Sequence, residues 1–97
     1  MPTYISLYRW TQQGIENIKE SPSRLDAARK LAQSMGAEIK AFYLVIGQYD
    51  FVVVTEAPNE ETVAKFALAI GAKGAARSET LRAFSEADYR KIIGALP

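Results

Sequence analysis

The chain has 97 residues, with twelve basic and eleven acidic side chains, a formal net charge of +1, and neither cysteine nor histidine. This length predicts one domain, residues 1–97, whose own core is modest. The missing thiol and imidazole groups exclude disulfides, thiolate nucleophiles, the usual zinc ligand sets and Ser-His-Asp triads. We therefore expect no metal and no cofactor.

The charges are spread along the chain, so no basic block is available to follow a phosphate backbone or an anionic membrane. Nucleic acid and membranes are therefore not expected partners. The opening "MPTYISLYRW" has no apolar stretch after a basic one, and no window approaches the ~20 apolar residues of a membrane span. These features indicate a cytoplasmic protein.

The first part of the chain predicts a strand and then a helical region. Residues 4–10 alternate with the period of two that is typical of a strand. Thr11 is placed to cap a weak first turn, and a bend is expected near Glu20. The segment "SPSRLDAARKLAQSMG" then predicts a helix with Ser21 as its cap and Gly36 at its end.

The rest of the chain predicts a hairpin, a helix, a strand and a C-terminal helix. These elements are the strands 37–46 and 51–55, the helix that Asn59 caps, the strand 76–84 and the helix that Ser85 opens. The order βαββαβ is that of the ferredoxin-like α+β class, with both long helices on one face of an antiparallel sheet. We expect the extra C-terminal helix to pack through an inner stripe of Tyr89, Ile92, Ile93 and Leu96.

Two helices cover only one face of such a sheet, so the other face needs a cover. We expect Tyr4, Tyr8 and Trp10 of the first strand on this open face. A contiguous apolar patch on a small chain usually marks a partner surface. We therefore predict a two-fold homodimer through the open sheet face, which encloses an interior that could hold a small organic molecule.

The segment "GQYDFVVV" carries a resemblance that extends over nearly the whole chain. With Gly47, Tyr49 and Asp50, the chain resembles the GYD family of small bacterial and archaeal proteins. The resemblance implies the dimeric α/β barrel superfamily and no assigned biochemical function. The segment is also similar to the hairpin in the effector-binding domain of leucine-responsive regulators, a related barrel that binds amino acids between subunits. This chain lacks their helix-turn-helix domain.

The hairpin region supplies the candidate site residues. Asp50 is interpreted as a turn residue that accepts hydrogen bonds from hairpin amides beside Gly47, or as a general base next to Tyr49. The predicted ligand-binding residues are Tyr8, Trp10, Tyr49 and Asp50. The weaker catalytic candidates are Asp50, Glu79 and Arg82. The pattern leaves open which sheet face Phe42, Tyr43 and Arg82 occupy.

Three functions follow from these residues. The first is a homodimeric module that binds a small ligand. The second is a cofactor-independent enzyme of the isomerase or small-monooxygenase type, with Asp50 or Glu79 as base and an arginine that stabilises an enolate. The third is an accessory subunit that binds another protein through a strand edge or the C-terminal helix.

Overall fold

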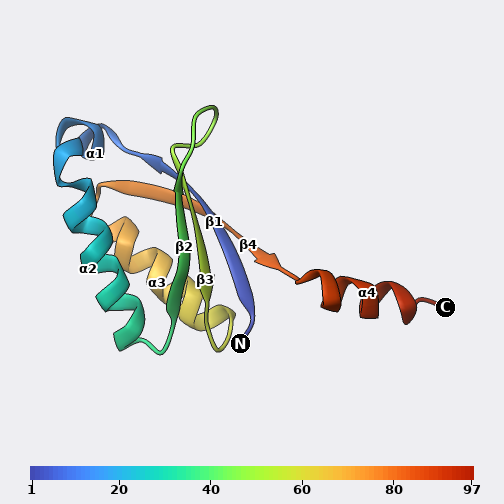
Figure 1. The fold of residues 1–97 in the computed structure, drawn as a ribbon. Helices are drawn as coiled ribbons and strands as arrows, with labels where there is room; N and C mark the ends of the chain where they lie inside the picture. Colours follow the sequence, from blue (N-terminus) through green and yellow to red (C-terminus); the bar gives the residue numbers. More distant parts are fainter.

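The computed structural model describes all of residues 1–97 and contains one four-stranded antiparallel sheet with helices on one side (Figure 1). The elements are β1 (Thr3–Trp10), α1 (Gln12–Glu16), the 3-10 turn η1 (Ile18–Glu20), α2 (Ser21–Ser34), β2 (Glu38–Leu44), β3 (Phe51–Glu56), α3 (Glu60–Ala72), β4 (Ala76–Ala83) and α4 (Glu86–Gly94). The strand order is β2-β3-β1-β4, with every neighbouring pair antiparallel. This is the predicted α+β arrangement of the ferredoxin-like class.

Side-chain caps begin three of the helices at the predicted places. The capping oxygens accept from N–H groups three residues on: Thr11 from Gly14 at 3.2 Å, Asn59 from Thr62 at 2.9 Å and Ser85 from Asp88 at 3.1 Å. Ser21 differs, since it is the first residue of α2 rather than its cap. Glu20 before it already has helical backbone angles, because η1 runs directly into α2.

The expected placement of the β1 aromatics was wrong. Tyr4 and Tyr8 are only 2% and 4% exposed and lie in the core under the helices. Trp10 packs against the same core. Both sides of β1 carry large apolar groups, so its alternation separates two faces without indicating which one the helices cover. The side of β1 that carries the bulkier aromatic rings forms the core between the sheet and the helices.

The side of the sheet without helices is therefore an aliphatic surface. Ile5 of β1 lies between Val54 and Leu81, and Leu7 lies beside Val52. From β2, Tyr43 faces this side and is 59% exposed, whereas Phe42 packs on the core. We call this surface the open face; its apolar members are Ile5, Leu7, Ala41, Tyr43, Val52, Val54 and Leu81.

Helix α4 extends away from the rest of the molecule (Figure 1). The expected inner stripe was wrong, since its four side chains are exposed: Tyr89 57%, Ile92 46%, Ile93 50% and Leu96 62%. The chain continues outward past the end of β4, so α4 does not turn back onto the sheet. The radius of gyration is 14.6 Å, against about 12.5 Å for a compact chain of this length.

None of the helices combines the length and the apolar character that a membrane crossing requires.

Candidate functional site

The loop between β2 and β3 is fixed to the end of β1. The main-chain N–H of Asp50 donates to the Tyr8 carbonyl at 2.8 Å. The Asp50 carboxylate accepts from the N–H of Trp10 at 2.9 Å, and the Arg9 guanidinium donates to the Gln48 carbonyl at 2.8 Å. Asp50 thus continues the pairing of β1 with its side chain where the β1–β3 ladder ends.

Gly47 makes this loop possible through its backbone conformation. Its φ is +124°, a region that side-chain-bearing residues rarely adopt. A Cβ atom there would meet nothing within 4 Å, so the requirement is conformational and not one of space. The predicted turn role of Gly47 agrees with this geometry. The Asp50 carboxylate, however, accepts from Trp10 on β1, and within the hairpin it is the main-chain carbonyl of Asp50 that accepts, from the Val45 N–H at 2.9 Å.

Tyr49 extends the loop contacts across the sheet to β4. Its hydroxyl donates to the Glu79 carboxylate at 2.7 Å, and the Arg9 guanidinium lies 4.9 Å from its ring centroid. The hydrogen bond to Glu79, with some burial, raises the pKa of Tyr49, because loss of the phenolic proton would put two negative charges together. Glycine, tyrosine and aspartate of the motif thus join the β2–β3 loop to β1 and β4.

A cavity of about 120 Å³ lies between the sheet and helices α2 and α3. Thirteen of its sixteen lining residues are hydrophobic. Phe51 is the centre of an aromatic cluster in its wall, with ring-centroid distances of 4.6 Å to Tyr8 and 5.2 Å to both Trp10 and Phe42. Burial raises the pKa of the Tyr8 phenol, so this hydroxyl stays neutral in the cavity wall.

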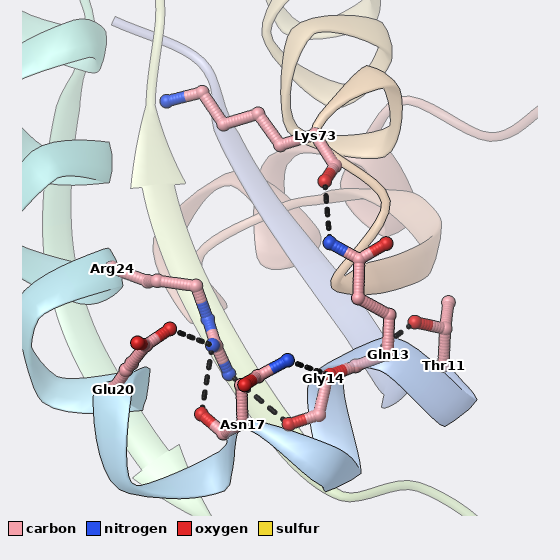
Figure 2. Close-up of polar contacts among 7 residues, drawn as sticks. All are labelled: Thr11, Gln13, Gly14, Asn17, Glu20, Arg24 and Lys73. Atoms are coloured by element: carbon pink, nitrogen blue, oxygen red, sulfur yellow. Dashed lines mark hydrogen bonds and ion pairs between the residues drawn. The ribbon is translucent and has the colours of Figure 1, made fainter.

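Polar contacts from α1 connect the chain segments at the rim of the cavity (Figure 2). Arg24 of α2 donates to the carbonyls of Asn17 at 3.0 Å and Gly14 at 3.4 Å. The amide of Gln13 donates to the Lys73 carbonyl at 3.4 Å. Through these bonds α1 connects α2 to the segment between α3 and β4.

The structure separates the predicted ligand-binding residues into two groups. Tyr8 and Trp10 line the cavity, whereas Tyr49 and Asp50 belong to the loop. Asp50 reaches the first group only through main-chain groups, the Tyr8 carbonyl and the Trp10 N–H.

The catalytic candidates also lie apart. Glu79 pairs with Leu7 on the open face, and Arg82 pairs with Tyr4, whose side chain is in the core on the other side of the sheet. Asp50 and Glu79 each already have a hydrogen-bond donor. One chain therefore does not bring Glu79 and Arg82 to a single site.

Several residues of the cavity were not predicted from the sequence. Phe51 shares the strand face of Val53, which is buried, and this alternation could have identified it. Four others come from the inner stripes of the helices, where core and cavity positions have the same spacing: Leu25, Ala28, Phe66 and Ile70.

The fold and the β2–β3 loop that is hydrogen-bonded to β1 and β4 define a small α+β protein of the ferredoxin-like class, with a Gly-x-Tyr-Asp segment between its second and third strands. The chain belongs to the GYD domain family, whose model matches residues 4–93.

One relative is the "Glutamine synthetase and cystathionine beta-lyase binding protein" of Thermus thermophilus. It is 37% identical over 89 residues, which are 91% of this chain and 94% of the relative. Two solved structures share the fold. The protein TTHA0845 of Thermus thermophilus has a TM-score of 0.55 at 24% identity and covers 88% of this chain and 95% of its own. The hypothetical protein PHS023 of Pyrococcus horikoshii has a TM-score of 0.53 at 20% identity, over 89% of this chain and 93% of its own.

Proposed function

We propose that this chain is an accessory protein that binds a metabolic enzyme. The observation that carries the proposal is the relative named for binding glutamine synthetase and cystathionine β-lyase, which aligns with 91% of the chain. The family model matches residues 4–93, which include all four strands and α4 except for Thr3 at the start of β1 and Gly94 at the end of α4. The same two enzymes are therefore the first partners to test.

Helix α4 is the surface that fits this role best. Three side chains of α4 and one just past its end follow the i, i+3, i+4, i+7 spacing of one helical face, and each is about half exposed or more: Tyr89, Ile92, Ile93 and Leu96. Beside this stripe, Arg90 forms an ion pair with Glu86 at 2.9 Å. An amphipathic helix with an uncovered apolar stripe is suited to a hydrophobic groove on another protein.

A second copy of the chain is the proposed cover of the open face. Its centre is aliphatic, with Ile5, Leu7 and Val54 side by side on neighbouring strands. Its margin carries both signs of charge, since Arg9 and Arg77 lie near Glu79. A self-complementary patch of this kind suits a two-fold dimer, the dimeric α/β barrel that the sequence predicts. This arrangement leaves α4 free for a different protein.

Co-elution on size-exclusion chromatography tests the enzyme-binding role. Glutamine synthetase and cystathionine β-lyase are purified from the organism that supplies this chain. Each enzyme is mixed separately with the wild-type chain, with Ile92→Asp and with Ala87→Asp. Ala87 lies on the side of α4 opposite the apolar stripe, so Ala87→Asp is the matched control. We expect the wild type and Ala87→Asp to elute with at least one enzyme and Ile92→Asp to elute alone. Separate elution of the wild type from both enzymes would contradict the proposal.

A further inference from the structure

The cavity between the sheet and helices α2 and α3 is large enough for one ring. Its volume is about 120 Å³, close to the ~150 Å³ of an engineered apolar cavity that binds benzene. A dinucleotide or a macrocycle would not fit this space. The size therefore favours a small ligand with one compact apolar group.

The cavity walls favour an aromatic group. Phe51 and its neighbours Tyr8, Trp10 and Phe42 present ring faces and edges with centroids 4.6 to 5.2 Å apart. Rings at such separations attract one another beyond simple burial of area. A further flat ring placed among them would make the same contacts.

The few polar lining residues indicate the charge of the ligand. They are Ser21, Arg24 and Lys73, so the lining has two cations and no carboxylate. Arg24 has a partner in Glu20, but at 3.8 Å and with the Glu20 side chain 71% exposed. No salt bridge involves Lys73. Figure 2 shows the Lys73 side chain extending from the end of α3 toward the side from which Arg24 comes.

We propose that the cavity binds a small aromatic monocarboxylate. Its ring lies among Tyr8, Trp10 and Phe51, and its carboxylate pairs with the Lys73 ammonium at the rim, where Arg24 adds positive potential. Asp50 takes part indirectly, because it holds the main chain of Trp10. Binding there is independent of enzyme binding through α4, since no α4 residue lines the cavity.

Tryptophan fluorescence provides a direct test, because Trp10 is the only tryptophan of the chain and lines the cavity. The protein is titrated with phenylacetate, with the neutral analogue phenylacetamide and with the cationic phenethylammonium ion, under excitation at a wavelength that only Trp10 absorbs. We expect a saturable change with phenylacetate. The amide should bind about fivefold more weakly, which is the upper range for one solvent-exposed ion pair, and the cation more weakly still.

Three variants separate the ring and carboxylate contacts from nonspecific quenching. Lys73→Gln should weaken phenylacetate binding about fivefold and leave amide binding unchanged, whereas Lys65→Gln, elsewhere on α3, should bind phenylacetate like the wild type. Ala28→Leu should fill the cavity and abolish the saturable change, while circular dichroism confirms that it is folded.

Three results would overturn the proposal. These are no saturable change in the folded wild type, equal affinity for acid and amide, or equal affinity in Lys73→Gln and Lys65→Gln. If Ala28→Leu does not fold, the comparison of the two lysine variants still decides whether the proposal stands.

Discussion

Asp50 is the residue whose role the geometry defines most closely. Its carboxylate satisfies the part-buried N–H of Trp10 at 2.9 Å. Replacement by alanine leaves that donor without its partner, so Asp50→Ala should lower the free energy of unfolding by about 1–3 kcal/mol. Asp50→Asn keeps one acceptor oxygen and should lose less. Urea denaturation measures both.

Asp26→Ala is the control for this change, because Asp26 is exposed on α2 and takes part in none of the ion pairs. Its effect should stay within about 0.5 kcal/mol. An equal loss in Asp26→Ala and Asp50→Ala would mean that the hydrogen bond to Trp10 contributes nothing specific.

Tyr8 predicts a change of stability at alkaline pH. Burial raises the pKa of its phenol in the folded state, whereas the unfolded chain releases this proton near pH 10. The folded state therefore binds the proton more tightly, and this contribution to stability is complete below about pH 10 and decreases as the pH rises through the folded-state pKa. Tyr8→Phe should lose less stability than the wild type in that range.

Urea denaturation between neutral pH and pH about 11, above the ordinary tyrosine pKa, measures this difference. Tyr89→Phe is the control, since this side chain is 57% exposed on α4 and lies outside the open face. Parallel curves for Tyr8→Phe and the wild type would show that Tyr8 has no part in it.

At the scale of elements, α4 should contribute little to the stability of the isolated chain. Its apolar stripe is exposed, so Ile92→Asp should change the free energy of unfolding by less than about 0.5 kcal/mol. Phe66→Ala in α3 removes a core ring that is only 6% exposed and should cost about 3–5 kcal/mol. Thermal denaturation of both variants tests this contrast. A large loss in Ile92→Asp would mean that α4 packs on its own chain or on a second copy.

The helices and strands also show how much of the fold the sequence could predict. Every strand and helix was expected within a few residues, because caps such as Asn59 and Ser85 and the alternation in β1 are local signals. The side of β1 that meets the helices was not predictable, since Tyr4 and Ile5 are both apolar. The apolar stripe of α4 indicated burial, but the amphipathic pattern does not tell whether the cover comes from the same chain.

The candidate site was predictable only in part for a related reason. Tyr8 and Trp10 could be singled out as pocket residues from their type alone, and both line the cavity. The bond from Trp10 to Asp50 joins residues forty positions apart. No local pattern indicates such a pair. Nor does any local pattern indicate that Lys73, at the end of α3, lines the cavity.

At the scale of the whole molecule, the open face should hold two copies together. Only 13 of the 97 residues are buried within one chain, so much apolar surface is left for association. Sedimentation velocity should show a dimer for the wild type and a monomer for Leu7→Asp, which places a charge in the centre of the open face. Leu68→Asp, at a position of α3 that is 73% exposed, should remain dimeric. A monomeric wild type at micromolar concentration would contradict the dimer.

Enzyme binding is tested most directly by native mass spectrometry of the untagged chain mixed with purified glutamine synthetase, and separately with cystathionine β-lyase. We predict a species whose mass equals one of the enzymes plus whole copies of this chain, which disappears when Ile92→Asp replaces the wild type. Spectra in which both enzymes and the chain keep only their own masses would contradict the proposed accessory role.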